Sequence, residues 1–285
     1  MTKQSMNMRR FVSSIRWRSQ RAIVISTVRF LKSLPPSLVV KVKESCRTVG
    51  RLDYEKADIS MMLDSTMQIS RLDACKKEPE TVQWIEQYVR EGDVLYDIGA
   101  NVGPYSLIAL IVANRNCRVY AFEPVFSTFA ALCQNVIANS ACGSIIPLNI
   151  ALSDRTGVLN FTSAIAPGSA LGYLEGQTFR SLSPHSELVT LPVISYRLDE
   201  FVERFRIKLP NHVKLDVDGS ECSVLRGFGS ILNSTTIKSL MVEIDETNEE
   251  SAETLDMLRD AEFRMRERHP HGEGGVANYI FARDE

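Results

Sequence analysis

The chain of 285 residues lacks several patterns that would assign it to a common class of protein. Its six cysteines form no Cys-x-x-Cys pair, so neither a zinc site nor a disulfide framework is expected, and reduced thiols in a cytoplasmic protein are favoured. The longest uncharged run within residues 1–36, residues 22–28, is far shorter than the roughly 20 residues that span a bilayer. No internal repeat or low-complexity segment is present. These absences favour an ordinary cytoplasmic globular protein.

Acidic residues are missing from one part of the chain. The first 43 residues contain ten Lys and Arg and no Asp or Glu, whereas the net charge of the whole chain is −2. By difference, the remainder carries about −12. Such an acidic body does not favour a polyanionic substrate, so nucleic acid is not expected as a partner.

Residues 1–36 form a basic segment with three open interpretations. Ile25, Val28 and Leu31 recur at helical spacing, and Pro35-Pro36 ends the predicted helix. The segment is a solvated or domain-packing extension, a helix that contacts a membrane surface or a partner weakly, or an organellar presequence. We assign residues 1–78 to this extension and a connecting region, and residues 79–285 to one catalytic domain.

Strands and helices alternate through most of residues 94–261, which predicts a mostly parallel sheet with helices on both faces. A long Gly-, Ser- and Pro-rich loop is expected at 163–187. Strand 158–162 is expected to pair as a hairpin with strand 144–151, and two strands without an intervening helix close the chain at 263–268 and 278–282. The five strands expected to build the sheet are a short strand from Val94 with Asp97 at its end, Arg118–Phe122, Ser144–Ala151, His212–Val217 and Ser239–Ile244.

The first of these strands runs into a glycine-bearing turn, Asp97-Ile-Gly-Ala-Asn-Val-Gly103. The turn lacks the Gly-x-Gly-x-x-Gly of a dinucleotide site, and no Gly-Lys-Ser/Thr of a P-loop is present. A nucleoside without phosphates therefore fits better than NAD, with Asp97 near a cationic amine. Glu123 ends the next strand, 24 residues after Gly99, where an acid can hold both ribose hydroxyls.

Several motifs in order resemble those of FkbM-type S-adenosylmethionine-dependent methyltransferases over residues 80–283. The resemblance implies a Rossmann-like class I methyltransferase fold, whose seven-stranded sheet has its last strand antiparallel. It also implies O-methylation of a hydroxyl on a sugar, glycan or secondary metabolite. The motifs are Asp97-Ile-Gly-Ala-Asn-Val-Gly103, Ala121-Phe-Glu-Pro124, Ala151-Leu-Ser-Asp154, Arg197-Leu-Asp-Glu200, Lys214-Leu-Asp-Val-Asp-Gly219 and Val224-Leu-Arg-Gly227.

The resemblance also implies roles for individual residues. Asp216 would face the amino-acid end of the cofactor or the acceptor, and Asp218 stands where the family more often has Glu. The remaining residues would each bind one part of S-adenosylmethionine: Gly99, Ala100, Asn101 and Gly103 in the turn, Asp97 at the methionine moiety, Glu123 and Pro124 at the ribose, and Ala151 to Asp154, including Ser153, beside the adenine.

A hydroxyl acceptor benefits from a base that takes its proton during methyl transfer. Asp216 and Asp218 are the candidates, on one face of a strand if the strand persists that far, and Glu243 is a third. No metal site is expected. His212 is assigned a structural role, whereas the loop residues His185, His269 and His271 are candidates for substrate contact. Two alternatives remain open: a membrane-surface or partner-binding protein without turnover, and an NAD-dependent oxidoreductase.

Overall fold

The computed structural model describes residues 22–164, 168, 172–175, 188–271 and 275–284. Contacts divide the chain into two compact units, residues 1–48 and 49–285. Leu52 and Ile59 belong to the hydrophobic core of the larger unit, so the region expected as a connection packs partly with the catalytic body. The family-domain boundary expected at residue 79 stays a prediction.

The described part of the N-terminal unit, residues 22–48, contains two helical segments. Residues 22–32 are helical, and α2 (Pro36–Ser45) follows after Pro35, with Pro36 at its first turn. Proline suits this position because the first N–H groups of a helix have no intrahelical acceptor. None of the residues of α2 is buried.

The larger unit is built on a seven-stranded sheet in which only β13 runs antiparallel to its neighbours β11 and β12. β13 lies second from one edge, as the sequence predicted for an antiparallel strand at or near an edge. This order confirms the Rossmann-like class I methyltransferase fold. Across the sheet the strands are β12 (Arg264–His271), β13 (Val276–Ala282), β11 (Ser239–Asp245), β10 (His212–Leu215), β3 (Val94–Ile98), β4 (Arg118–Phe122) and β5 (Ile145–Leu148).

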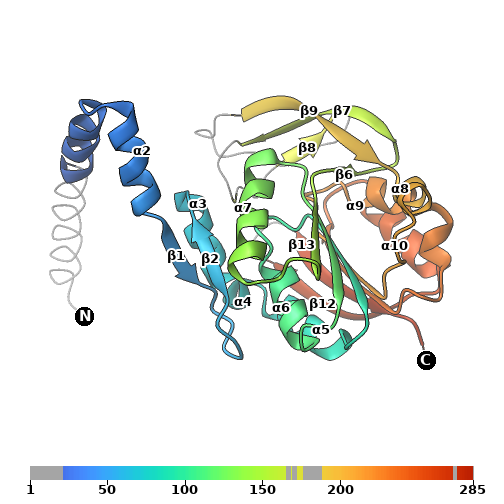
Figure 1. Ribbon diagram of the computed structural model, residues 1–285. Helices are drawn as coiled ribbons and strands as arrows, with labels where there is room; N and C mark the ends of the chain where they lie inside the picture. The colour runs from blue at the N-terminus through green and yellow to red at the C-terminus, as the bar shows by residue number, and fades with distance from the viewer. Residues whose placement is uncertain (1–21, 165–167, 169–171, 176–187, 272–274, 285) are drawn as a thin grey trace, which may run out of the picture. The chain divides into compact units, whose positions relative to one another are not determined.

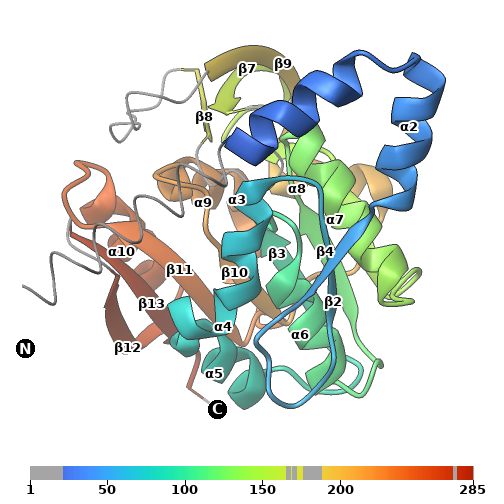
Figure 2. The same ribbon diagram turned by 90° about the vertical axis from the view of Figure 1, so that its left-hand side faces the viewer.

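Helices cover both faces of this sheet (Figures 1 and 2). Successive strand residues point to opposite faces, so Leu95 packs in one hydrophobic cluster and Tyr96 in the other. The first cluster contains side chains of α5 (Pro79–Tyr88), α6 (Pro104–Val112) and α7 (Phe126–Ala138). The second contains side chains of α8 (Leu198–Phe205), α9 (Glu221–Phe228) and α10 (Ser251–Asp260).

A second, four-stranded sheet was not expected from the sequence. β5 ends at Leu148, and the side-chain amide of Asn149 then donates to the carbonyl oxygens of Glu123 and Pro124, where the ladder between β4 and β5 stops. The prediction of one strand over 144–151 with 158–162 as its hairpin partner is therefore wrong. The second sheet has the order β6 (Ala151–Leu152), β9 (Leu188–Tyr196), β7 (Gly157–Ala164) and β8 (Gly172–Leu174).

Short elements precede the main sheet: a pair of strands, β1 (Thr48–Arg51) and β2 (Ser60–Leu63), then α3 (Thr66–Ile69), η1 (Ser70–Asp73) and α4 (Ala74–Lys77), while η2 (Gly229–Asn233) follows α9. All six cysteines are free thiols. Among the described residues, no helix is both long and apolar enough to cross a bilayer.

Candidate active site

A cavity of about 310 Å³ opens at the carboxyl ends of β3, β4 and β10, where ligands bind in open α/β sheets. The structure places Asp97, Gly103 and Ser153 outside its lining. Ser153 is buried instead against the hydroxyl of Ser195, at 2.8 Å, so its predicted place beside adenine is not supported by this geometry. The predicted residues that do line the cavity are Gly99, Ala100, Asn101, Glu123, Pro124, Ala151, Asp216 and Asp218.

The turn after β3 needs its two glycines for the packing of the chain on itself. Gly99 has φ +81°, and a Cβ there would lie 1.8 Å from the carbonyl oxygen of Asp216. Gly103, at φ +85° before α6, would place a Cβ 2.5 Å from a methyl carbon of Leu132. From the sequence, these glycines were expected to let a ligand approach the backbone closely. The structure shows that the turn first has to approach the end of β10 and the side of α7.

Glu123 is held in one orientation at the end of β4. Its Oε2 accepts a hydrogen bond of 3.0 Å from the N–H of Asn101, and its Oε1 accepts one of 2.9 Å from the N–H of Val125. Burial raises the pKa of Glu123 to about 7, although these N–H groups lower it. Each carboxylate oxygen accepts more than one hydrogen bond, so Glu123 keeps acceptor capacity for hydroxyl donors in the cavity.

Asp97 lies beneath the turn, 1% exposed, and its Oδ2 accepts a hydrogen bond from the hydroxyl of Ser106. Its Oδ1 is buried without a hydrogen-bond partner among the described residues. Burial raises the pKa of this carboxyl group. A buried acceptor left unsatisfied costs about 1–3 kcal/mol. Asp97 lies outside the cavity lining, so of these two acids only Glu123 faces the cavity, where it could accept hydrogen bonds from the hydroxyls of a nucleoside.

Lys214 is a site residue to which the sequence assigned no role. Its Nζ donates a hydrogen bond of 2.7 Å to Oδ2 of Asp216 and lies 5.1 Å from the ring centroid of Tyr105. Burial lowers the pKa of Lys214, but the carboxylates of Asp216 and Asp97 outweigh it and hold the pKa above its ordinary value. Lys214 and Asp216 are two residues apart, the spacing that places side chains on one face of a strand, so the motif contained a signal for this pair.

Three carboxylates gather in one part of the cavity, at the ends of β10 and β11. One oxygen each of Asp216, Asp218 and Glu243 lies within 4.8 Å of the others, a set of ligands that could hold a divalent cation. Burial and the neighbouring carboxylate of Asp216 raise the pKa of Glu243 to about 9, so this group is protonated at neutral pH. The expectation of no metal stays a prediction. β10 ends at Leu215 and Asp218 has φ +54°, so a turn, and not a shared strand face, brings Asp216 and Asp218 together.

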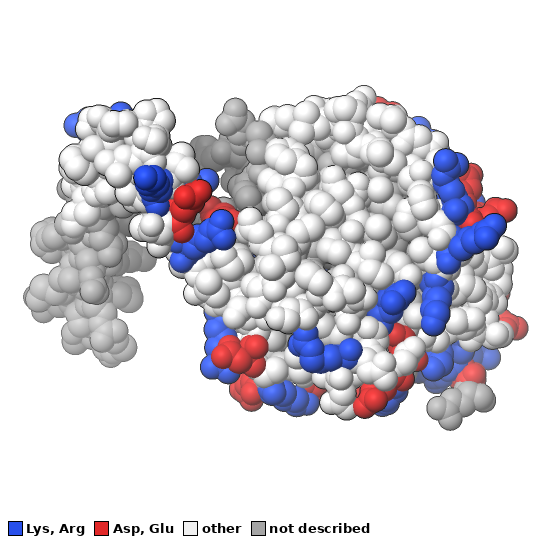
Figure 3. Space-filling view, in the orientation of Figure 1, with Lys and Arg blue, Asp and Glu red and all other residues white. Residues whose placement is uncertain are grey.

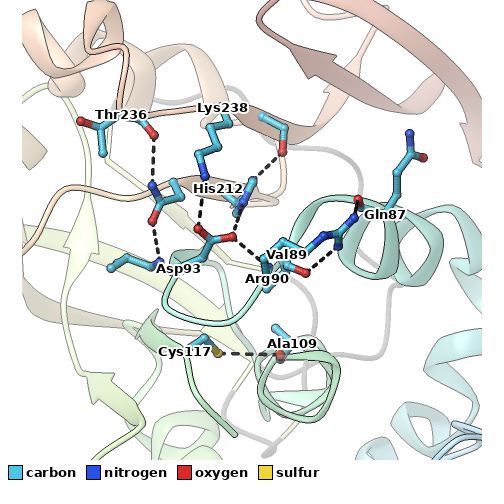
Figure 4. Close-up of polar contacts among 12 residues, drawn as sticks. Gln87, Val89, Arg90, Asp93, Ala109, Cys117, His212, Thr236 and Lys238 are labelled. Atoms are coloured by element: carbon cyan, nitrogen blue, oxygen red, sulfur yellow. Dashed lines mark hydrogen bonds and ion pairs between the residues drawn. The ribbon is translucent and has the colours of Figure 1, made fainter. Parts of the chain in front are cut away.

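His212 has the structural environment expected of it (Figure 4). Its Nε2 lies 3.1 Å from Oδ2 of Asp93 and its Nδ1 lies 2.8 Å from the hydroxyl of Ser239, at the start of β10 and away from the cavity. Lys238 also points at Asp93, at 3.4 Å. Burial lowers the pKa of His212, so the ring is neutral above its ordinary pKa.

The remaining histidines lie on β12 or outside the described residues. β12 extends to His271, so the prediction that His269 and His271 lie in a loop is wrong. The Nε2 of His269 lies 2.8 Å from a carboxylate oxygen of Glu267 on the same strand. His185 lies outside the described residues.

The sequence prediction named no residue of two further groups that line the cavity. Phe161 of β7 and Leu174 of β8 bring the second sheet to the cavity wall. Arg71 of η1, Lys77 at the end of α4 and Glu78, between α4 and α5, form the other group. The sequence offered no periodicity in the loop region and no family motif before residue 80, so neither group had a readable signal.

Comparison with known proteins identifies the family. The methyltransferase FkbM domain matches residues 97–265, which contain the turn after β3, Glu123 and the three carboxylates of Asp216, Asp218 and Glu243. The chain is similar to hexuronic acid methyltransferase AglP of Haloferax volcanii, with 34% identity over 182 residues, 64% of this chain and 68% of that protein. It is also similar to the 31-O-demethyl-FK506 methyltransferase FkbM of Streptomyces tacrolimicus, with 28% identity over 194 residues, 60% of this chain and 72% of that protein.

Among solved structures, the methyltransferase FkbM from Methylobacillus flagellatus aligns with a TM-score of 0.48 and 14% identity, over 76% of this chain and 56% of that one. The oxidoreductase alternative has no support in the family match. The chain belongs to the FkbM methyltransferase family, and it is a methyltransferase.

Proposed function

We propose that the protein transfers the methyl group of S-adenosylmethionine to a hydroxyl oxygen of a sugar, a glycan or a secondary metabolite. The observation that carries the proposal is Glu123, a buried acid at the end of β4 that lines the cavity beside the turn after β3. A carboxylate held there suits the two hydroxyls of a ribose. The names of the relatives, one acting on hexuronic acid and one on an O-demethylated FK506, support an oxygen acceptor on such a molecule.

Different residues of the cavity would bind different parts of the cofactor. Glu123 would accept hydrogen bonds from the ribose hydroxyls, and the N-terminal end of α6 adds positive electrostatic potential. Asp216, which lines the cavity, would face the amine, whereas Asp97 lies outside the lining and would support the turn from beneath through Ser106. Ile150, Ala151 and Leu152 supply apolar surface for the adenine ring. Bound in this way, S-adenosylmethionine supplies a methyl group activated by a sulfonium.

The protein's contribution to the reaction is to hold the acceptor oxygen in line and to take its proton. The carboxylate of Asp216 already accepts a hydrogen bond from Lys214, and the raised pKa of Glu243 favours its protonated form at neutral pH. Asp218 lines the same part of the cavity and is therefore the base that we propose. Asp218→Asn should lower kcat and leave the cofactor affinity unchanged. Asp216→Asn should lower both kcat and the cofactor affinity.

Calorimetry with S-adenosylmethionine tests the cofactor assignment. The wild type should bind, and Glu123→Ala should bind at least tenfold more weakly, because a hydrogen bond to a charged group contributes about 1.5–3 kcal/mol. Glu200→Ala is the matched control, because Glu200 is on α8 and outside the cavity lining. Absence of binding by the wild type, or equal affinity of wild type and Glu123→Ala, would overturn the assignment.

Mass spectrometry of products tests the acceptor. Uronic acids, neutral glycans and hydroxylated metabolites are incubated separately with enzyme and cofactor, and each is examined for the mass of one added methylene group. Mild alkali then distinguishes the two oxygen products, since it removes a methyl ester of a carboxyl group and leaves a methyl ether intact. An alkali-labile product or an N-methylated product would contradict methylation of a hydroxyl.

A further inference from the structure

The N-terminal unit presents apolar side chains that its own helices do not bury. Every residue of the helical segment 22–32 except Leu31 is exposed, and α2 buries none of its residues. A helix in a soluble protein normally turns its apolar stripe to a core, and clustered exposed apolar side chains mark interaction sites. The most exposed of them are Ile23 (65%), Phe30 (63%), Val24 (58%) and Val40 (52%).

Positive charge accompanies these apolar side chains. Arg29 and Lys32 lie on the first helical segment, and Lys41 and Lys43 lie on α2. The first acidic residue of the chain is Glu44, after ten Lys and Arg. On the face drawn in Figure 3, uncharged side chains cover most of the described surface of this unit, and the charged ones are few.

We propose that the helical segment 22–32 and α2 lie on an anionic membrane surface. The apolar side chains enter the boundary between headgroups and acyl chains, and the Lys and Arg side chains contact lipid phosphates. The combination decides between occupants. A second copy of the chain would bring two segments of the same high positive charge together, and nucleic acid would satisfy the cations but leave the apolar side chains in water. An anionic bilayer matches both features at once.

Flotation of the full-length protein with vesicles tests this proposal. Vesicles of phosphatidylcholine alone are compared with vesicles that also contain phosphatidylglycerol. The protein should float with the anionic vesicles and much less with the neutral ones, and added salt should reduce the floating fraction. Absence of flotation with the anionic vesicles would overturn the proposal.

Two sets of variants locate the contact. The triple variant Ile23→Ser, Val24→Ser, Phe30→Ser should bind anionic vesicles more than tenfold more weakly. Its matched control replaces three equally exposed apolar residues of the larger unit by serine, Ile137, Val158 and Met265. In the second set, Arg29→Gln, Lys32→Gln and Lys41→Gln should each weaken binding about fivefold, from about 1 kcal/mol per cation near the surface. Lys56→Gln, Lys76→Gln and Arg259→Gln, three exposed cations of the larger unit, are the controls.

Equal flotation of the apolar variant and its control would overturn the proposal. Sedimentation without lipid tests self-association as the alternative. The proposal would also be overturned if the wild type self-associated, the apolar variant were monomeric and both bound lipid equally well. Affinity for S-adenosylmethionine, measured for every variant, should equal that of the wild type. This last readout separates failure of the membrane proposal from failure of the proposed methyl transfer.

Discussion

Lys214 and Asp216 form an ion pair of 2.7 Å in which the lysine side chain is 2% exposed and the aspartate side chain 26% exposed. The same ammonium group interacts with the buried carboxylate of Asp97. One cation therefore balances two carboxylates at the ends of neighbouring strands, β3 and β10. Without it, both acids would face each other across the floor of the cavity, so the pair supports the site as well as the fold.

Replacing the lysine should uncover this dependence. Lys214→Met keeps the length of the side chain and removes its charge, and it should lower the free energy of unfolding by about 3 kcal/mol, since breaking a buried pair leaves an uncompensated charge. Urea denaturation measures the change. Lys56→Met, in an exposed pair with Glu86, should cost less than about 1 kcal/mol. Equal costs for the two variants would show that the Lys214 pair is not structurally important.

The buried carboxyl groups of Glu123 and Glu221 should make stability depend on pH. Burial raises the pKa of each to about 7, above the ordinary 4.5, so the folded state binds more protons than the unfolded state between these values. Their stabilising contribution is complete below pH 4.5 and is lost as the pH rises through 7. For Glu123 alone the change amounts to about 3 kcal/mol.

Urea denaturation of the ligand-free protein between pH 5 and 8 measures this effect. Glu123→Gln should flatten the slope, and affinity of the wild type for S-adenosylmethionine should rise with pH over the same range, because ribose hydroxyls donate to the charged form. An unchanged slope in Glu123→Gln would show that another group titrates.

The sequence predicted the strands at the base of the site better than the elements that line its sides. Arg118–Phe122 was predicted at its observed bounds and the strand that starts at Val94 to within one residue of its end, because short apolar runs ended by Asp97-Ile-Gly and Glu-Pro have few other interpretations. The second sheet was missed because Ala151–Leu152 is only two residues long and pairs with residues more than forty positions later. Such a partnership depends on tertiary contacts and leaves no local periodicity.

The arrangement of the three carboxylates could not be predicted from the sequence, for a different physical reason. Asp216 and Asp218 were expected on one strand face, but the chain leaves the strand after Leu215 and Asp218 adopts a positive φ. Glu243 reaches the same place from the next strand. Whether these acids are charged depends on burial and on one another, and neither quantity can be read from spacing along the chain.

Glu243 should be dispensable as a base at neutral pH. Burial and then Asp216 raise its pKa to about 9, so Glu243→Gln replaces a protonated carboxyl group by a neutral amide of similar size. We expect kcat at pH 7 to change by less than about threefold, a difference of less than 1 kcal/mol in the barrier. Steady-state rates from pH 7 to 10 test this, and a loss of more than tenfold at pH 7 would assign Glu243 a direct role.

The same charge balance predicts that methyl transfer does not require a divalent metal. The ammonium of Lys214 and the proton on Glu243 already reduce the charge of the acidic cluster. A chelator should therefore leave the rate unchanged, and added magnesium should not raise it. Loss of activity on chelation that magnesium restores would show instead that Asp216, Asp218 and Glu243 hold a metal.

Gly99 should tolerate no side chain, and the reason can be separated from its backbone conformation. Gly99→Ala would place a Cβ 1.8 Å from the carbonyl oxygen of Asp216, so the end of β10 must move. We expect a loss of about 4 kcal/mol in the free energy of unfolding and loss of cofactor binding. Gly92→Ala is the matched control, because Gly92 has nearly the same φ, +85°, and open space around it. Strain alone should cost that variant about 1 kcal/mol and leave cofactor affinity intact. If both variants lose equal stability and both still bind S-adenosylmethionine, the contact between the turn and Asp216 does not shape the cofactor site.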